Sequence, residues 1–362
     1  MPIETTAAVA YPGARDFAWE PVVLDDPGPG EVLVRMVATG VCHTDLSVLA
    51  GRLPTPLPAV LGHEGAGVVE RVGPAVTTCA IGDRVVLSFD SCGSCARCRT
   101  GRPTRCPHYF ARNFAAARPD GTPLVHHRNG IAIGGRFFGQ SSLAKHAIVS
   151  AHTVVPVNAG SDDELARYAP IGCGIQTGAG TVLNLLKPEP GQRLAVLGAG
   201  AVGLAAVMAS RLSGVAEIHV VDKVPARSAL AQELGATVLA ESVDELRGLD
   251  YIIETTGVPT LLEAAVDAVG PGGVVAVIGA PAAGTRIDVD VNGLIDGRTL
   301  LGVTEGGSDR TTFIPALIAL HRTGRLPIDR LMRFYPPEQL SRAVDDARSG
   351  ITVKPVIRFE AS

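Results

Sequence analysis

The sequence predicts an α/β protein with two domains, one rich in β-strands and one built on a doubly wound parallel sheet. Three observations support this prediction. Short apolar stretches separated by Gly and Pro dominate residues 1–90. From residue 194 to residue 303, apolar strands alternate with helical patterns, as in a parallel sheet with crossover helices. A chain of 362 residues is also too long for one ordinary core and suits two domains.

The predicted β-rich domain is supported by three stretches near the start of the chain. Residues 31–37, 68–72 and 84–87 are apolar and enriched in β-branched side chains. The turns at 27–30 and 82–83 contain the Gly, Pro and Asp residues that punctuate strands. We therefore expect residues 1–90 to be mostly strand.

A short run of cysteines predicts a metal site. The pattern is C-x2-C-x2-C-x7-C, at Cys92, Cys95, Cys98 and Cys106. Four thiolates so close in sequence can converge on one tetrahedral zinc ion, and four cysteines leave no position for a substrate. We predict a structural zinc site in a small lobe at about residues 90–107. An iron–sulfur cluster is an alternative, although the bacterial pattern has three residues where this chain has seven. Disulfides need oxidising surroundings, which makes them a weaker alternative.

The stretch Gly62–Gly67 contains His63, which we interpret as part of a second metal site. Cys42 and Cys173 are the other candidate ligands. One His and two Cys give three zinc ligands, and a catalytic zinc keeps its fourth position open for water or substrate. Cys173 lies between two glycines, where the backbone can approach a ligand closely. Taken alone, Cys173 could equally be a small buried hydrophobe.

A glycine-rich motif predicts a dinucleotide site. Gly198-x-Gly200-x-x-Gly203 follows a predicted strand, opens a helix, and is followed 19 residues later by Asp222. The glycines let the backbone approach a pyrophosphate at the helix N-terminus. Asp222 would accept hydrogen bonds from the ribose hydroxyls of NAD and would repel the extra phosphate of NADP. Lys223, next to it, weakens that preference slightly.

The remaining elements complete the predicted order. Strands are expected at 194–197, 217–221, 237–240, 250–254, 274–278, 299–303 and 353–358. Helices are expected from a capping box at Ser161 to Pro170, and at 177–186, 204–212, 227–234, 260–269, 311–323 and 337–349. We expect the last strand to rejoin the first domain, so that the nucleotide-binding domain is an insertion.

Residues 107–140 show little periodicity and concentrate aromatic side chains. They contain Phe110, Phe114, Phe137 and Phe138. These rings could line an apolar pocket or could pin a long loop to the core, and the sequence leaves both interpretations open. His126 and His127 are adjacent, so on a strand they would point to opposite faces. We expect this pair in a solvated loop.

The composition excludes several classes of function. The net charge is −4 and is not segregated into blocks, so we expect no nucleic-acid partner and no anionic membrane surface. No run of about 20 apolar residues predicts a membrane span. The first residues do not resemble a signal peptide, and we expect a cytoplasmic protein whose cysteines serve metals or catalysis.

These motifs together resemble a known family. Gly62-His63-Glu64-x-x-Gly67, followed by Gly73 and Val76, is similar to the signature of zinc-dependent medium-chain alcohol dehydrogenases. The four-cysteine run, Cys173 and the glycine motif occur in the order of that family, over nearly the whole chain. The likeness is strongest to the aryl-alcohol (benzyl alcohol) dehydrogenase branch. It is carried by residues 42–46, 137–142 and 172–180.

The resemblance implies domains, cofactors and an assembly. Residues 1–174 and 305–362 would form a GroES-like catalytic domain, and residues 175–304 a Rossmann domain that binds NAD. Each chain would hold two zinc ions. The protein would act on a small-molecule alcohol or aldehyde and would form a homo-oligomer, either a dimer or a tetramer.

The resemblance also implies roles for individual residues. Cys42, His63 and Cys173 would hold the catalytic zinc, and Cys92, Cys95, Cys98 and Cys106 the structural zinc. Glu64 would lie behind the catalytic metal and ligate it transiently, and Asp45 would orient His63. The residues that would contact NAD are His43, Thr177, Gly198, Gly200, Val202, Gly203, Asp222, Arg227 and Lys354. Among them, Thr177 would pack near the nicotinamide, and His43 and Lys354 would face the pyrophosphate.

The implied proton path departs from the family at one position. Thr44 would take the alcohol proton and pass it towards the cofactor ribose. Many relatives carry a His five residues after the first zinc Cys, whereas this chain has Ser47. Ser47 with a water molecule is the only group we assign to the last step. Cys79 matches no ligand position.

The implied activity is the interconversion of a primary benzylic alcohol and its aldehyde, by hydride transfer to NAD. Leu53 and Phe89, with the aromatic residues at 110–138, would form a slot for a flat unsaturated alcohol, although Phe89 could instead pack in the core. The alternatives are an allylic terpenoid (geraniol-type) alcohol dehydrogenase and a non-catalytic NAD- or zinc-binding regulator. A dehydrogenase of glutathione–formaldehyde adducts is a weaker alternative, because the sequence shows no obvious pocket for an anionic substrate.

Overall fold

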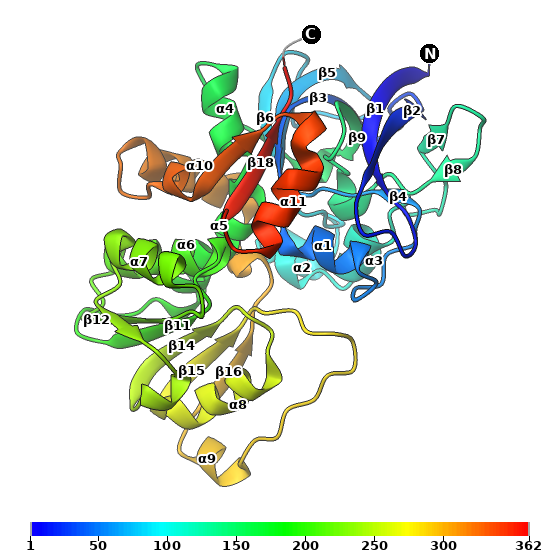
Figure 1. The fold of residues 1–362 in the computed structure, drawn as a ribbon. Coiled ribbons are helices and arrows are strands. Elements are labelled where there is room, and N and C mark those ends of the chain that lie inside the picture. The colour runs from blue at the N-terminus through cyan, green and yellow to red at the C-terminus, as the bar shows by residue number, and fades with distance from the viewer. Residues whose placement is uncertain (1, 361–362) are drawn as a thin grey trace. The chain divides into compact units, whose positions relative to one another are not determined.

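The computed structural model describes residues 2–360, which divide into two compact units (Figure 1). The first unit contains the chain up to Cys173, then Asp309–Ile318 and the described residues from Asp329 onwards. The second unit contains Gly174–Ser308 and Ala319–Ile328. The sequence-based boundaries, 1–174 with 305–362 and 175–304, differ from this division mainly at residues 319–328, which lie with the second unit.

The first unit is built on two sheets. One has the strand order β4-β1-β2-β7-β8, and the other has the order β10-β6-β5-β3-β18-β17 with β9 also paired to β3. The strands are β1 (Ile3–Ala10), β2 (Ala18–Leu24), β3 (Glu31–Gly40), β4 (Ala59–Val60), β5 (Gly65–Val72), β6 (Arg84–Leu87), β7 (Val125–His127), β8 (Ala132–Ile133), β9 (His146–Ser150), β10 (Val154–Pro156), β17 (Met332–Tyr335) and β18 (Lys354–Arg358). The helices are α1 (His43–Leu49), α2 (Ala96–Arg99), α3 (Tyr109–Phe114), α4 (Asp162–Tyr168) and α11 (Leu340–Arg348).

Strand β3 is the centre of the larger sheet. Nearly all of its ten residues are buried, and it pairs with β5, β9 and β18. Gly67 of β5 packs so close to β3 that a Cβ there would lie 2.3 Å from the carbonyl oxygen of Arg35. This close approach explains the glycine within a strand. Strand β18 pairs antiparallel with β3, as expected for a chain end that rejoins the first unit.

The second unit is a six-stranded parallel sheet with the order β13-β12-β11-β14-β15-β16. Its strands are β11 (Arg193–Leu197), β12 (Glu217–Val221), β13 (Val238–Ala240), β14 (Leu249–Glu254), β15 (Val269–Val277) and β16 (Thr299–Gly302). Its helices are α5 (Gly174–Gly180), α6 (Ala201–Leu212), α7 (Pro225–Leu234), α8 (Pro259–Ala268) and α9 (Val291–Ile295). Helices α6 and α7 cover one face of the sheet and α8 the other (Figure 1). Helix α10 (Arg310–Arg322) begins in the first unit and ends in the second.

Several elements of the structure differ from the sequence-based ones. His126 and His127 lie in strand β7 and are half-buried, so the prediction of a solvated loop is wrong. His126 lies 3.4 Å from a carboxylate oxygen of Asp25, and the ring of His127 stacks on Tyr11. Helix α1 was not predicted. The helix expected at 177–186 starts earlier, as α5, and ends in a π-helical segment, Thr181–Leu186.

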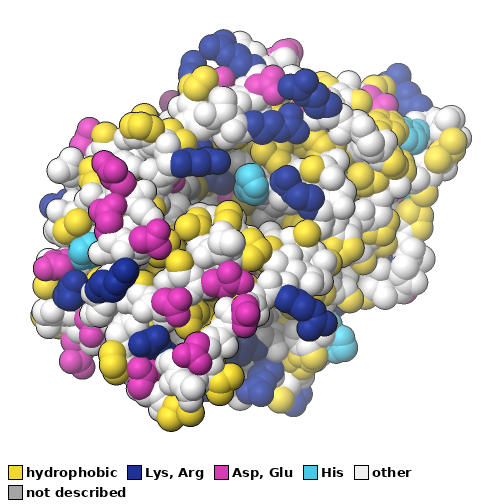
Figure 2. All heavy atoms as spheres, turned by 60° about the horizontal axis from the view of Figure 1, so that its bottom comes forward, with side chains coloured by type: hydrophobic (Ala, Val, Ile, Leu, Met, Phe, Trp, Pro, Cys, Tyr) yellow, Lys and Arg dark blue, Asp and Glu magenta, His cyan; other side chains and the backbone are white. Residues whose placement is uncertain are grey.

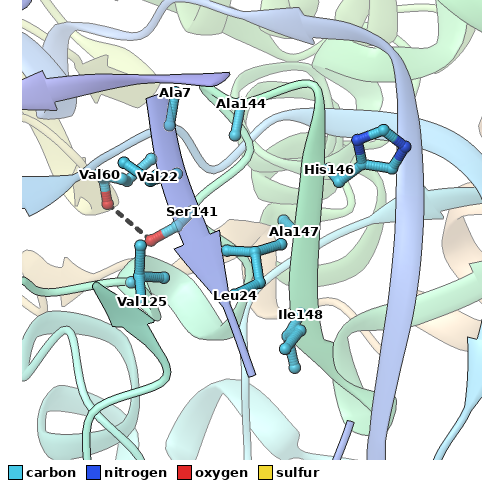
Figure 3. A pocket seen from close by; sticks show the side chains of 11 residues that line it. Ala7, Val22, Leu24, Val60, Val125, Ser141, Ala144, His146, Ala147 and Ile148 are labelled. Carbon is cyan, nitrogen blue, oxygen red and sulfur yellow. Dashed lines mark hydrogen bonds between the residues drawn. The ribbon is translucent and has the colours of Figure 1, made fainter. Parts of the chain in front are cut away.

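A minor cavity lies between the smaller sheet of the first unit and strand β9 of the larger sheet. Figure 3 shows the side chains around it, including Ala7, Val22, Leu24 and Ile148. Its volume is about 10 Å³, roughly the space of a single water molecule. The cavity is therefore a packing defect in an apolar core and has no room for a substrate.

The surface carries both signs of charge. On the face drawn in Figure 2, acidic and basic side chains both occur, with hydrophobic side chains between them. Among residues 2–360, no helix combines the length and the apolar character that crossing a membrane requires.

Candidate active site and metal centres

Three segments of the first unit bring four metal-binding side chains together. Ligand atoms of Cys42, His63, Glu64 and Cys173 all lie within 4.8 Å of one another. Cys42 precedes helix α1, and His63 and Glu64 precede strand β5. Cys173 follows the 3-10 turn Ala169–Gly172. The sequence-based prediction of a distant Cys as the third partner therefore agrees with this geometry.

The backbone before Cys173 is held against strand β6. A Cβ on Gly172 would lie 1.9 Å from the carbonyl oxygen of Leu87. The hydroxyl of Ser88 donates to the carbonyl oxygen of Gly172 at 2.7 Å. Only glycine permits this approach, which places Cys173 beside segments that precede it by more than 100 residues.

His63 is oriented by a buried carboxylate. Its Nδ1 donates to Asp45 Oδ1 at 3.0 Å, and both side chains are fully buried. Asp45 also accepts from the backbone N–H groups of Cys42 (2.9 Å) and Gly62 (3.0 Å). The other ring nitrogen of His63, Nε2, is buried and has no hydrogen-bond partner among the described residues. An unpartnered imidazole nitrogen beside two thiols fits a zinc ligand.

Two aromatic rings support His63. Phe138 stacks on the imidazole with ring centroids 4.5 Å apart, and Phe137 contacts it edge-on at 5.5 Å. Both rings are buried, and both contact Phe114. Phe110 is 75% exposed. For Phe137 and Phe138, the structure thus supports the interpretation that the rings pin the loop to the core.

Glu64 is paired with Lys354 beneath the cluster. The ammonium of Lys354 lies 2.8 Å from both carboxylate oxygens of Glu64, and it also donates to the carbonyl oxygen of Val41 at 3.4 Å. Burial lowers the pKa of Lys354, but the charge and hydrogen bonds of Glu64 and the charges of Cys42 and Cys173 together outweigh burial and raise it above its usual value. Lys354 is 3% exposed and pairs with Glu64, and its contact with the cofactor pyrophosphate stays a prediction.

The sulfur of Cys42 lies in surroundings that favour the thiolate. A hydrogen bond from Cys173 lowers the pKa of Cys42, desolvation raises it, and the charges of Lys354 and His63 lower it further. The net effect is a pKa well below the usual value. Because the thiolate is the form that binds metals, the lowered pKa of Cys42 favours binding of a metal cation by this cluster.

The predicted relay residues lie on helix α1. Thr44 is half-buried, and its hydroxyl oxygen lies 3.8 Å from the sulfur of Cys42. Ser47, one helical turn later, is 6% exposed. Its hydroxyl accepts a hydrogen bond from Arg52 at 3.2 Å, a contact that the sequence analysis missed. His43 is exposed at the first position of α1.

The predicted pocket residues differ in accessibility. Phe89 is only 1% exposed, with its ring 5.9 Å from that of Tyr109. The guanidinium carbon of Arg310 lies 4.8 Å from the Phe89 ring centroid. These contacts favour the alternative in which Phe89 packs in the core. Leu53 is half-buried and packs against the hydrophobic core cluster that contains Phe89.

The four-cysteine run forms a second cluster. Ligand atoms of Cys92, Cys95, Cys98 and Cys106 lie within 4.8 Å of one another, and no disulfide joins them. The sulfur atoms of Cys92 and Cys98 are 3.9 Å apart, and those of Cys95 and Cys106 are 4.0 Å apart. A tetrahedral site with zinc–sulfur bonds of about 2.3 Å has edges of about 3.8 Å, so these separations fit zinc.

One cysteine of this cluster already favours its charged form. Burial raises the pKa of Cys92, but the backbone N–H groups of Cys95 and Ser94 outweigh burial, and the pKa is lowered to about 5. The N–H of Cys95 approaches the sulfur of Cys92 at 3.3 Å. These contacts within the loop prepare the sulfur for a metal without help from distant segments.

The glycine motif lies in the second unit, between β11 and α6. Gly198 has a φ of +94°, which favours glycine. A Cβ on Gly203 would lie 1.9 Å from the carbonyl oxygen of Gly198. Gly200 precedes α6, and a Cβ there would meet nothing within 4 Å. Two glycines therefore serve the turn and its packing, while the third leaves space at a helix N-terminus, as a pyrophosphate requires.

Asp222 links this loop to the end of strand β12. Its carboxylate accepts from the backbone N–H of Ala199 at 2.6 Å and of Val224 at 2.8 Å. Arg227, on the first turn of α7, has a buried Nε without a partner among the described residues. Val202 is half-buried on the first turn of α6. These predicted cofactor residues thus lie on the elements that flank the glycine loop.

Thr177 belongs to a polar group that sequence reasoning missed. Its hydroxyl donates to Glu305 Oε2 at 3.4 Å, and Gln176 donates to the same oxygen at 3.1 Å. Glu305 is buried and has a φ of +49°, which is uncommon for a side-chain-bearing residue. Glu305 could have been singled out from the sequence, because it lies just beyond the carboxyl end of the strand predicted at 299–303.

Comparison with known proteins places this geometry in a family. Residues 28–159 match the family described as "Alcohol dehydrogenase GroES-like domain", and residues 201–321 match "Zinc-binding dehydrogenase". The chain is 40% identical to a geraniol dehydrogenase of Castellaniella defragrans, over 99% of this chain and 98% of that protein. The chain belongs to the zinc-dependent medium-chain alcohol dehydrogenases.

Solved structures of the family have the same fold. An alcohol dehydrogenase zinc-binding domain protein from Burkholderia ambifaria is 47% identical, with a TM-score of 0.95 over the whole of both chains. A benzyl alcohol dehydrogenase from Acinetobacter calcoaceticus is 41% identical, with a TM-score of 0.93 over 99% of this chain and 100% of that one. The protein is therefore an oxidoreductase acting on alcohols, with a GroES-like and a Rossmann-like domain, in a family that uses zinc and NAD or NADP.

Proposed function

We propose that this alcohol dehydrogenase interconverts a primary benzylic alcohol and its aldehyde by hydride transfer to NAD. The observation that carries the proposal is the 41% identity, over 99% of the chain, to a benzyl alcohol dehydrogenase. The 40% identity to a geraniol dehydrogenase supports a second candidate, an allylic terpenoid alcohol. In both substrates an unsaturated carbon lies beside the carbinol carbon, and an apolar pocket separates such substrates only weakly.

Each chain would hold two zinc ions. Cys42, His63 and Cys173 would bind the catalytic ion, with Glu64 behind it, and the four-cysteine cluster would bind the structural ion. When bound, the catalytic ion supplies a Lewis acid that lowers the pKa of the alcohol hydroxyl and polarises an aldehyde carbonyl. Asp45 holds His63 in one orientation and fixes which ring nitrogen is available.

The residues of helix α1 would carry the alcohol proton away. Thr44 lies 3.8 Å from Cys42 and would accept the proton first. Ser47 lies one turn along the same helix, and residues three apart on a helix are neighbours. Its hydroxyl accepts from Arg52, so its own hydrogen is available to a water or to Thr44. Ser47 would thus take the place of the relay His found in many relatives.

NAD is proposed over NADP because of Asp222. The carboxylate lies at the end of β12, next to the glycine loop, and it accepts from Ala199 and Val224. A fixed negative charge there would disfavour a phosphate on the adenosine ribose. Asp222→Ser should reduce the ratio of kcat/KM for NAD over NADP by about tenfold, the equivalent of about 1.4 kcal/mol. Equal kcat/KM of the wild type with both cofactors would contradict the role.

The substrate proposal is tested by a panel of benzyl alcohol, cinnamyl alcohol, geraniol and ethanol. Burying a phenyl-sized group is favourable by roughly 1.5–3 kcal/mol, so benzyl alcohol should exceed ethanol in kcat/KM by on the order of tenfold to a hundredfold. Geraniol above benzyl alcohol would favour the second candidate. Ethanol as good as benzyl alcohol would refute both.

A homo-oligomer is also proposed. Strand β16 lies at the end of the six-stranded sheet, and Leu300 on it is 38% exposed. On the nearby segment α9, Val291 is 68% and Ile295 is 77% exposed. An exposed sheet edge with apolar side chains favours pairing with another copy. Light scattering that gives a monomer mass would refute this proposal. The cytoplasmic location stays a prediction.

A further inference from the structure

Arg310 is a buried arginine outside both metal clusters. It is the first residue of α10 and is 6% exposed. Its Nη2 donates to the hydroxyl of Ser91 at 3.1 Å. Its Nε and Nη1 are buried and have no hydrogen-bond partner among the described residues. Burying a charged group with two unmet donors is costly unless another negative group is supplied.

The surroundings of Arg310 lead to the four-cysteine cluster. Ser91 immediately precedes Cys92, so the guanidinium of Arg310 is hydrogen-bonded to the residue next to the first ligand of the cluster. Burial lowers the pKa of Arg310, and the charges of Asp90 and Asp309, followed by that of Cys98, act against this shift. The Ser91 hydroxyl therefore joins the guanidinium to the segment that carries the four cysteines.

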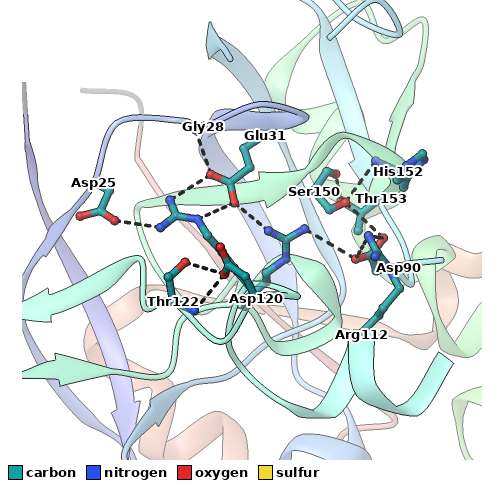
Figure 4. A network of polar contacts seen from close by, with 12 residues as sticks. Asp25, Gly28, Glu31, Asp90, Arg112, Asp120, Thr122, Ser150, His152 and Thr153 are labelled. Carbon is teal, nitrogen blue, oxygen red and sulfur yellow. Dashed lines mark hydrogen bonds and ion pairs between the residues drawn. The ribbon is translucent and has the colours of Figure 1, made fainter. Parts of the chain in front are cut away.

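The nearby carboxylate is already occupied by other partners. Asp90 is fully buried and lies 3.1 Å from Arg112 and 3.7 Å from Arg136. It also accepts from the backbone N–H of Ser91 at 2.8 Å and from the hydroxyl of Ser150 at 3.1 Å. Figure 4 shows Asp90 among Arg112, Ser150 and His152. No hydrogen bond or ion pair joins Asp90 to Arg310 among the described residues, so the Nε and Nη1 donors of Arg310 remain available to another anion.

The four-cysteine cluster is the anion that fits. Four thiolates with one divalent zinc carry a net charge of about −2, and hydrogen bonds to ligand sulfur atoms help to hold such a site. We propose that Arg310, acting through Ser91, stabilises the negative charge of the metal-loaded four-cysteine centre and slows the loss of its zinc. This inference rests on the proposed structural zinc site. Arg310 is separated from Ser91 by 219 positions in the sequence, so the lobe would depend on a distant part of the chain.

The experiment measures zinc release from the four-cysteine centre alone. All variants are made in a Cys173→Ala background, in which the catalytic ion is expected to be absent, and zinc transfer to a coloured chelator is followed. Arg310→Gln removes the guanidinium, and Ser91→Ala removes the connecting hydroxyl. The matched control is Arg136→Gln, which removes an equally buried guanidinium (5% exposed) that pairs with Glu31 at 2.7 Å and with Asp90.

Loss of such a supporting residue typically changes metal affinity by about 10–100-fold. We expect Arg310→Gln to release zinc at least about tenfold faster, Ser91→Ala to show a smaller increase, and Arg136→Gln to stay within about twofold of the background. If Arg310→Gln does not fold, Arg310→Lys and Ser91→Ala carry the test. Equal release from the Arg310 and Arg136 variants would overturn the inference. A folded Cys173→Ala protein without any zinc would instead show that the four-cysteine assignment itself is wrong.

Discussion

The two cysteine clusters of the first unit are held in opposite ways. The four-cysteine cluster comes from one segment of 15 residues, and contacts within that segment, such as the Cys95 N–H on Cys92, lower the pKa of the Cys92 thiol. The Cys42 cluster is assembled from three segments, and its orientation depends on buried groups around it, Asp45 and Lys354. The four-cysteine site, which leaves no position for a substrate, thus depends mainly on local sequence. The Cys42 site, which would keep a position open, depends on the fold.

This difference teaches where each site is vulnerable. Asp45 fixes three things together, namely the His63 ring, the start of α1 and the Gly62 turn, so a change there affects the whole cluster. In the part of the chain that the structure describes, no carboxylate accepts from several groups of the four-cysteine loop in this way. Its proposed outside support is a single guanidinium, Arg310, acting through Ser91.

The sharpest test of the comparison is the loss of one ligand from the open cluster. Cys173→Ala should lose one of two zinc ions and at least about a thousandfold in kcat, because a Lewis acid contributes several kcal/mol to the barrier. The protein should stay folded, because no structural strand depends on that sulfur. Elemental analysis, circular dichroism and an NADH absorbance assay measure these outcomes. Cys79→Ala, a half-buried thiol outside both clusters, is the control.

The corresponding change in the closed cluster should act on stability first. Cys95→Ala should lower the free energy of unfolding by several kcal/mol, because structural zinc sites contribute directly to folding. The measurement is the thermal midpoint together with the soluble yield. If Cys95→Ala left stability intact and abolished turnover alone, the proposed division of roles between the two clusters would be reversed.

Substitution of Asp45, which supports only the Cys42 cluster, should distinguish the two clusters by how firmly each retains its zinc ion. Asp45→Asn keeps the size of the side chain but weakens the hold on His63, and loss of such a partner typically reduces metal affinity by about 10–100-fold. Only the ion at Cys42, His63 and Cys173 should be lost more easily to a chelator, while the four-cysteine ion is retained. Equal loss of both ions would mean that Asp45 supports the domain rather than one cluster.

The smallest expected effect concerns which alcohol the proposed substrate slot beside the catalytic site binds. Leu53→Ala should lower kcat/KM for benzyl alcohol by about three- to tenfold, since roughly 0.8 kcal/mol is lost per buried methylene. Turnover of ethanol should change less, because ethanol has no ring to bury. Identical losses for both alcohols would remove Leu53 from the proposed slot. Phe89→Ala is a poorer probe, because Phe89 is 1% exposed and its removal would leave a cavity.

Much of the second unit was predictable from the sequence. Strand β12 was predicted at its observed bounds, and β11 and β14 to within one residue. The glycine motif predicted the loop between β11 and α6 because two of its glycines meet local requirements, a positive φ at Gly198 and a close contact at Gly203. Apolar strands and local turns depend on neighbours in sequence, which a sequence shows directly.

Predictions failed where side-chain partners come from elsewhere in the chain. The pairing of Lys354 with Glu64, 290 positions away, was not predicted. His126 and His127 were placed in a solvated loop, but Asp25 and Tyr11 flank them in the sheet. The charge of a Lys or the ring of a His is visible in the sequence, whereas its partner is not.

The sequence by itself determined the two-domain α/β architecture, the family, the four-cysteine lobe and the glycine loop, because these rest on short-range spacing and periodicity. Only the tertiary structure left His63 Nε2 without a hydrogen-bond partner among the described residues, buried Phe89, and placed Arg310 against Ser91. The physical reason is that these features depend on which distant side chains share a buried space. That choice is made by the packing of the whole unit around β3 and not by any one segment.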